Sequence, residues 1–104
     1  MGAPINEQPD PISFHRDDAG QRYVIEYDGK RIGLIDFRVA GDGLIALPHT
    51  EVDEEYGGRG FAGRLTRFAL DDIRERDLKI VDRPLCPYIR DWIGKHPEYK
   101  DLRA

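Results

Sequence analysis

Cysteine is almost absent from this chain of 104 residues. Its one cysteine, Cys86, excludes an internal disulfide and any metal site built from several cysteines. Positive charge is also scarce. The chain has 16 lysines and arginines but 20 aspartates and glutamates, which gives a formal net charge of -4. Proteins that bind nucleic acid neutralise its phosphates with an excess of Lys and Arg. We therefore expect no nucleic-acid partner.

Long apolar runs are absent too. No stretch approaches the roughly 20 consecutive apolar residues that span a bilayer, and residues 1–11 lack the basic and apolar regions of a signal peptide. We expect a cytoplasmic protein without a membrane partner. The three histidines, His15, His49 and His96, share no common spacing, so the sequence predicts no metal site.

The remaining composition is that of a folded domain. Hydrophobic residues make up 39% of the chain and charged residues 35%, which is typical of a globular protein. Prolines lie among polar residues near the start, and we predict a flexible tail over residues 1–12. Residues 13–104 contain no linker or internal repeat, which predicts a single domain.

Alternating apolar residues in the first half of the chain predict β-strands. The pair Asp28-Gly29 supplies the positive φ angles of a tight hairpin turn. A second turn over residues 40–43 returns the chain along residues 44–52. The alternating residues are Tyr23, Ile25 and Tyr27 before the first turn and Ile35, Phe37 and Val39 after it. Together these patterns predict an antiparallel meander of three or four strands.

Pro48 interrupts the last strand of this meander. Proline donates no hydrogen bond to a neighbouring strand, so it belongs at a bulge or at the edge of a sheet. We predict that the strand over residues 44–52 bends or splays at Pro48. A proline on an ordinary edge strand is the alternative.

Beyond the meander the apolar pattern changes to the helical period of about 3.6. The apolar residues on one helical face are Phe61, Leu65, Phe68, Ala69 and Ile73. Residues 78–81 suit a strand parallel to the strand 44–52, entered by a right-handed crossover. Pro87 is placed to begin a second helix that carries Tyr88 and Trp92. The sequence thus predicts a mixed α/β (α+β) fold in the order meander, helix, parallel strand, helix.

The glycine-rich turn over residues 56–60 lies between a strand and a helix. The first amides of a helix have no internal partner, so such a turn is suited to bind a phosphate. A plain chain reversal with positive φ at Gly57 or Gly58 is the alternative. The preceding strand belongs to an antiparallel meander, which argues against a βαβ dinucleotide-binding unit, and no Walker lysine follows. The turn therefore favours a phosphate-bearing ligand such as coenzyme A.

Four blocks of the sequence resemble the small, one-domain, acetyltransferase-like members of the GNAT family. The blocks are His49-Thr50-Glu51-Val52, Tyr56-Gly57-Gly58-Arg59-Gly60-Phe61-Ala62, Leu85-Cys86-Pro87-Tyr88-Ile89 and His96-Pro97-Glu98-Tyr99. Four blocks in this order are much more specific than any one of them. The resemblance covers about half of the chain and implies a GNAT-like fold, in which a splayed strand pair forms the cleft for coenzyme A.

The resemblance also implies acetyl-CoA as the acyl donor. The main chain from Thr50 to Val52 would hydrogen-bond the pantetheine amides. The turn and the start of the helix would hold the pyrophosphate through Gly57, Gly58, Arg59, Gly60, Phe61 and Ala62. Glu55 stands where the family motif has Gln or Arg, and Gly57 stands where close relatives often have a basic residue. Both departures remove positive charge, for which Arg59 and Arg64 are placed to compensate.

Cys86 is a candidate nucleophile because it directly precedes Pro87 at the start of the second helix. A thiol there feels the positive end of the helix dipole, and Arg83 nearby favours the thiolate in the same way. A thiolate accepts an acetyl group from coenzyme A, so Cys86 is a candidate covalent relay. A buried cysteine that fills space between strand and helix is the alternative.

His49, Glu51 and Tyr88 are the other catalytic candidates. His49 and Glu51 share the parity of Ile45 and Leu47 along their strand, which predicts side chains facing the core or a pocket. Either is a candidate general base. By the resemblance, Tyr88 would give a proton to the departing coenzyme A thiolate, while packing beside Trp92 is the alternative.

The sequence thus predicts an enzyme that transfers an acetyl group from acetyl-CoA to an amine. The chain has no room for the helices that enclose the acceptor site in common GNAT enzymes, which favours an open groove and a protein or peptide acceptor. A module that binds coenzyme A or acyl-CoA without turning it over is the alternative from another class. A scaffold that only retains the fold is a third.

Overall fold

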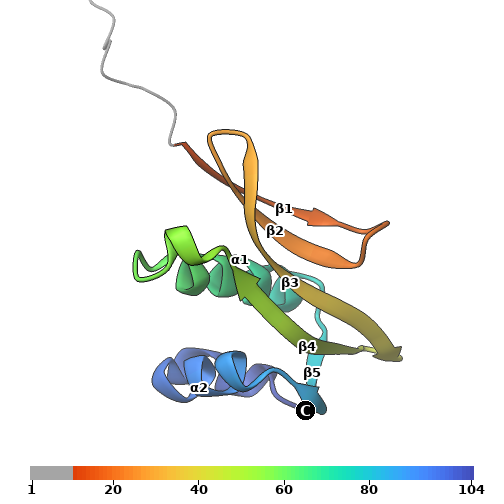
Figure 1. Ribbon diagram of the computed structural model, residues 1–104. Helices are drawn as coiled ribbons and strands as arrows, with labels where there is room; N and C mark the ends of the chain where they lie inside the picture. The colour runs from red at the N-terminus through yellow and green to blue at the C-terminus, as the bar shows by residue number, and fades with distance from the viewer. Residues whose placement is uncertain (1–10) are drawn as a thin grey trace, which may run out of the picture.

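The computed structural model describes residues 11–104, which form one five-stranded sheet with two helices. The elements are β1 (Ile12–Asp17), β2 (Arg22–Tyr27), β3 (Lys30–Gly41), β4 (Leu44–Val52), the 3-10 turn η1 (Glu54–Tyr56), α1 (Phe61–Glu75), β5 (Lys79–Leu85), α2 (Pro87–Lys95) and the 3-10 segment η2 (Pro97–Leu102). The strands lie in sequence order; β1 to β4 pair antiparallel, and β5 pairs parallel to β4. In Figure 1, α1 crosses behind β3 and β4, and α2 lies below it.

This arrangement confirms the predicted meander, helix, parallel strand and helix. The meander has four strands, and its first hairpin turns at Asp28 and Gly29 with φ angles of 51° and 84°. Positive φ at both central residues matches the right-handed twist of the flanking strands. The predicted tail over residues 1–12 lies mostly outside the described residues, and Ile12 is already a buried member of β1.

The core lies between the sheet and the apolar face of α1. Leu65, Ala69 and Ile73 of α1 are fully buried, as the helical spacing predicts. They pack against one face of the sheet, which contributes the buried side chains Tyr23, Ile25, Ile35 and Phe37. Burial of each large aliphatic side chain contributes about 1.5–3 kcal/mol relative to exposure. This layer holds α1 against the meander.

Asp72 near the end of α1 joins the helix to the sheet. Its Oδ2 accepts hydrogen bonds from the Tyr23 hydroxyl at 2.8 Å, from Arg16 Nη1 at 3.2 Å and from Arg76 Nε at 2.8 Å. Burial raises the pKa of the Asp72 carboxyl, but the hydrogen bonds from Tyr23, Arg76 and Arg16 lower that pKa by more, so the net shift is downward. The ionised form of Asp72 is therefore the one that stabilises the fold.

A bulge in β4 confirms the predicted irregularity at Pro48. Asp36 of β3 pairs with His49, whereas Arg38 pairs with Ala46. Phe37 alone thus stands opposite both Leu47 and Pro48, because β4 contains one extra residue there.

The strand predicted over residues 78–81 is longer in the structure, where β5 continues to Leu85. Ile80 pairs with Ile45 and Leu85 with Leu47, so residues 81–84 stand opposite Ala46 alone. The exposed residues Asp82, Arg83 and Pro84 break the apolar pattern and form an irregularity in β5 before Leu85 pairs with β4. For that reason the strand predicted from the apolar pattern ended four residues before β5 does.

We expect Asp72→Asn to lower the free energy of unfolding by about 1.5–3 kcal/mol at pH 7, because hydrogen bonds to a charged group are lost. Urea unfolding followed by circular dichroism measures this change. The pKa of Asp72 is lowered in the fold, so its stabilisation is present above the ordinary value of 3.8 and is lost as the pH falls through the folded pKa. The difference between wild type and variant should therefore narrow below that value.

Asp101→Asn is the matched control. Asp101 pairs with Arg74 at 2.8 Å on the surface, where solvent screens the ion pair. The control should unfold like wild type. Equal loss of stability in both variants would contradict the role given to Asp72.

Candidate functional site

The pairing of β4 with β5 ends halfway along β4. The last paired residues are Leu47 and Leu85, and the amide of Cys86 donates to the carbonyl of Leu47 at 2.8 Å. The rest of β4, residues 48–52, pairs with β3 but not with β5. This leaves an opening between β4 and the end of β5, as the splayed strand pair predicts.

The backbone of Thr50 and Val52 faces this opening. The amide of Asp53 donates to the carbonyl of Ile32 at 2.7 Å, so Asp53 is a residue whose polar groups point toward β3. Alternate residues of an antiparallel strand point to opposite sides, which directs the amides and carbonyls of Thr50 and Val52 away from β3. The Thr50 hydroxyl is buried and has no hydrogen-bond partner in the described part of the chain. The backbone polar groups of Thr50 and Val52 thus have no strand partner on the side of β5.

The first turn of α1 adds free backbone donors nearby. Gly58 and Gly60 have φ angles of 77° and 78°, and Gly60, which precedes the helix, makes no side-chain cap. The amides of Phe61 and Ala62 belong to the first turn, whose donors have no partner inside the helix. A Cβ atom built on Gly58 or Gly60 would meet nothing within 4 Å. An anion can therefore approach these amides closely.

Two arginines, one in the turn and one in the first turn of α1, lie against aromatic rings. The Arg59 guanidinium lies 5.5 Å from the centre of the Tyr56 ring, and that of Arg64 lies 5.5 Å from the centre of the Phe14 ring. Glu55 has Lys30 beside it at 3.9 Å. The acidic residue that departs from the family motif is thus accompanied by a cation.

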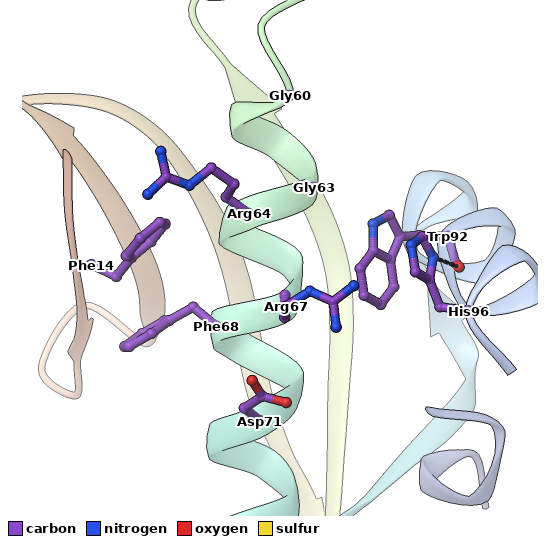
Figure 2. Close-up of a pocket in the computed structure, with 9 residues that line it drawn as sticks. All are labelled: Phe14, Gly60, Gly63, Arg64, Arg67, Phe68, Asp71, Trp92 and His96. Carbon is purple, nitrogen blue, oxygen red and sulfur yellow. Dashed lines mark hydrogen bonds between the residues drawn. The ribbon is translucent and has the colours of Figure 1, made fainter. Parts of the chain in front are cut away.

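A groove of about 480 Å³ runs along the exposed side of α1. Its lining residues are Phe14, Gly60, Gly63, Arg64, Arg67, Phe68, Asp71, Trp92 and His96. Figure 2 shows Arg64 on the side of Phe14, while Arg67 extends toward Trp92 of α2. The groove includes two predicted cofactor residues, Gly60 and Arg64, and none of the catalytic candidates.

Sequence reasoning assigned no site role to the other seven lining residues, among them Arg67, Trp92 and His96. The Arg67 guanidinium lies 5.3 Å from the centre of the Trp92 ring, and the His96 ring stacks on Trp92 at 3.7 Å. His96 Nδ1 also lies 2.7 Å from the Trp92 carbonyl. The helical spacing of Arg64, Arg67 and Asp71, three and four residues apart, was a usable signal.

Cys86 lies between the end of β5 and α2, at the base of the opening. Cys86 is 7% exposed, and its carbonyl accepts a hydrogen bond from the amide of Arg90 at 3.0 Å in the first turn of α2. The thiol is therefore buried next to the point where the strands separate. That this thiol is unusually acidic, and that it accepts an acetyl group, both stay predictions.

Tyr88 reaches from α2 to α1. Its hydroxyl lies 3.8 Å from where a Cβ atom of Gly63 would stand. Burial raises the pKa of the Tyr88 phenol; the neighbouring Thr66 side chain lowers this pKa, the charge of Cys86 raises it, and the net shift is upward. Tyr88 thus keeps its proton at neutral pH and is able to donate it.

His49 and Glu51 do not face the core, so the predicted parity is wrong. The extra residue at the Pro48 bulge reverses the alternation: Thr50 pairs with Ile35 and shares the face of α1, which turns His49 and Glu51 to the opposite face. Their side chains are 54% and 57% exposed, with His49 Nε2 at 3.7 Å from Glu51 Oε1. Both lie on the open side of the sheet.

Residues 11–104 contain neither a metal-binding cluster nor a membrane-spanning helix. No group of three or more His, Cys, Asp or Glu side chains in this range is arranged to hold a metal ion. No helix in the same range is long and apolar enough to cross a bilayer. That the protein works without a metal ion stays a prediction.

We expect Gly60→Ala to lower the free energy of unfolding by about 1–2 kcal/mol, because a residue with a Cβ is strained in the left-handed conformation. Gly94→Ala is the matched control, since Gly94 lies within α2 and its Cβ would meet nothing within 4 Å. Alanine favours a helix by about 0.5–1 kcal/mol over glycine, so the control should be slightly more stable than wild type. Chemical unfolding of both proteins decides, and an equal response would contradict the strained turn.

The chain has relatives among known sequences. The family profile described as GCN5-related N-acetyl-transferase matches residues 22–102. Protein NATD1 of Gallus gallus is 33% identical over 93 residues, which cover 88% of this chain and 82% of that protein. Protein NATD1 of Homo sapiens is also 33% identical over 93 residues, which cover 88% of this chain and 80% of the relative.

Solved structures share the fold. The solution structure of a GCN5-like protein from Staphylococcus aureus has a TM-score of 0.69 at 21% identity, covering 93% of this chain and 91% of that chain. The crystal structure of Ard1 from Thermoplasma volcanium has a TM-score of 0.58 at 20% identity. The match covers 78% of this chain and 57% of the Ard1 chain. With the profile match across most of the strands and both helices, these findings show that the chain belongs to the GCN5-related N-acetyltransferase family.

Proposed function

We propose that this protein transfers an acetyl group from acetyl-CoA to an amine of a protein or peptide. The observation that carries the proposal is the unpaired end of β4 beside the uncapped first turn of α1. Membership of an N-acetyltransferase family supports it. When bound, acetyl-CoA would supply the activated acetyl group as a thioester.

The residues of the opening suit the two polar parts of this donor. The free amides and carbonyls of Thr50 and Val52 match the amides of pantetheine in the way a neighbouring strand would. The first-turn amides of Phe61 and Ala62 suit a pyrophosphate, and Gly60 leaves space for its close approach. Together they bind the donor along the gap between β4 and the start of α2.

The groove along α1 suits the adenosine half of the donor. It begins at Gly60, next to the proposed pyrophosphate position, and contains the guanidinium groups of Arg64 and Arg67. Arginine suits phosphate, and the aromatic rings of Trp92 and Phe14 line the same groove. These arginines supply the positive charge that Glu55 and Gly57 do not.

The residues suited to remove a proton and the residue suited to donate one lie on opposite faces of the sheet. His49 and Glu51 lie on the open face, where they can remove a proton from an incoming amine. Tyr88 lies on the helix side and carries a proton that it can give to the departing thiolate. An acceptor that approaches the open face need not be small, and this favours an amine on a protein or peptide.

Thermal unfolding with acetyl-CoA tests the proposal. A ligand at 100 times its dissociation constant stabilises the fold by about 2.7 kcal/mol, so a clear rise in melting temperature is expected. Gly60→Asp should abolish this rise, because its carboxylate would occupy the anion position at the helix start. Gly94→Asp, which places the same charge on α2, should keep it.

Release of free thiol in the presence of an amine and peptide panel then separates the two classes of function. Release above the uncatalysed rate supports an enzyme. Binding without release would assign the chain to the non-catalytic acyl-CoA module instead. A wild-type protein that gains no stability with millimolar acetyl-CoA would contradict both.

The relay through Cys86 has its own test. In a relay, the Cys86 sulfur bonds to the acetyl carbon as the bond to the coenzyme A sulfur breaks, so the protein gains one acetyl group. Intact-mass analysis after incubation with acetyl-CoA should show this adduct in wild type and not in Cys86→Ala. Thiol release by Cys86→Ala at the wild-type rate would show that the amine attacks the donor directly.

A further inference from the structure

The groove along α1 has a cation fixed on its Trp92 side. Gly60 precedes the helix, and Gly63 lies one turn further on, where an added Cβ atom would stand 3.4 Å from Trp92 Nε1. Residues three or four positions apart share a helix face, so Arg67 follows these two glycines along the groove. Figure 2 shows that Arg67 extends toward Trp92, whereas Arg64 points to the opposite side.

Three contacts hold the Arg67 guanidinium. Its Nη1 donates to the Tyr99 hydroxyl at 3.1 Å, and its central carbon lies 5.5 Å from the centre of the Tyr99 ring and 5.3 Å from that of Trp92. Tyr99 is 5% exposed and Trp92 is 8% exposed, so both rings belong to the packed core. A side chain held in this way loses little further freedom when it binds a ligand.

The Tyr99 hydroxyl bridges Arg67 and Asp71. It donates to Asp71 Oδ1 at 2.7 Å while it accepts from Arg67. Burial raises the pKa of the Tyr99 phenol and Asp71 raises it further, against the smaller opposite effect of Arg67, so the phenol keeps the proton that it donates. The Asp71 carboxylate is thereby engaged by Tyr99, one helical turn beyond Arg67 and away from Gly60.

The Arg67 guanidinium is also open to a ligand. Its side chain is 48% exposed, and its charged neighbour Glu98, at 3.8 Å from Nη1, is 57% exposed. An exposed ion pair of this kind contributes little. The planar guanidinium, in contrast, can donate to two oxygens of a phosphate at once. A phosphate in the groove can therefore take the place of Glu98.

The spacing along α1 suits a ligand with two phosphate groups on one ribose. Five to six residues separate the amides of Phe61 and Ala62 from Arg67, which is about 7.5–9 Å of helix. The ribose of coenzyme A carries its pyrophosphate on C5′ and a phosphate monoester on C3′, so three carbon atoms separate the two esters. A donor whose pyrophosphate lies at the start of α1 can thus extend its 3′-phosphate along the groove to Arg67.

We propose that Arg67 binds the 3′-phosphate of the donor and so selects coenzyme A over its 3′-dephospho form, with Tyr99 as the positioning residue that holds the guanidinium. The inference rests on the proposed function, which assigns the pyrophosphate to the first turn of α1. The selection lies in binding alone, because no bond is made or broken at Arg67.

Calorimetric titration of the protein with coenzyme A and with 3′-dephospho-coenzyme A tests the inference, because these ligands differ only in the monoester. We expect wild type to bind coenzyme A about tenfold more tightly, through added hydrogen bonds between charged groups. Arg67→Gln should bind the two ligands within about twofold of each other and keep the wild-type affinity for the dephospho form. Arg67→Lys keeps the charge but loses the planar fork, so its preference should lie in between.

Arg90→Gln is the matched control, because it removes the same charge from an exposed position of α2 outside the groove. It should keep the wild-type preference. Tyr99→Phe removes the bridging hydroxyl and should lower the preference, but it should cause no further change in an Arg67→Gln background. Each preference compares two ligands on one protein, so a partial loss of folded protein does not alter it.

The outcomes separate this inference from the proposed function. Equal affinity of wild type for the two ligands, or a preference that survives in Arg67→Gln, would overturn the role of Arg67. The same loss of preference in Arg90→Gln would overturn it too, since net charge alone would then explain the selection. A preference for coenzyme A in a protein that acetylates no amine would support the inference and contradict acetyl transfer. Binding of neither ligand would contradict the proposed donor and the inference with it.

Discussion

The loss of hydrogen bonding between β4 and β5 after Leu47 is the constraint on which the candidate site depends. Pro48 has no amide to donate, and the bulge beside it adds a residue to β4. β5 ends at Leu85, and α2 begins two residues later at Pro87, so no strand follows along the rest of β4. The backbone groups of Thr50 and Val52 are therefore exposed to a ligand, a few residues before the free amides of α1.

The same bulge divides the polar side chains between the two faces of the sheet. Thr50 faces the helices, whereas His49 and Glu51 face the open side. Tyr88 lies on the helix side, where its hydroxyl approaches Gly63 of α1. One inserted residue thus separates the groups suited to receive a proton from the group suited to give one.

Local chemistry made much of this fold predictable. The Asp28-Gly29 turn, the helical spacing of α1 and Pro87 at the start of α2 each express a preference of a few neighbouring residues. The side of the sheet taken by His49 was not predictable in this way, because it depends on how many residues of β4 stand opposite Phe37. The groove was missed because it requires α1 and α2 to pack together.

The uncapped start of α1 has a consequence for the range of its attraction. The field of a helix terminus falls off within about one turn, whereas the net charge of -4 acts over a Debye length of about 8 Å at physiological salt. We therefore expect large polyanions to be repelled by the net charge before they come near the turn. A compact diphosphate that reached the turn would meet amides with open space around them, so we expect this helix end to favour small anions over large ones.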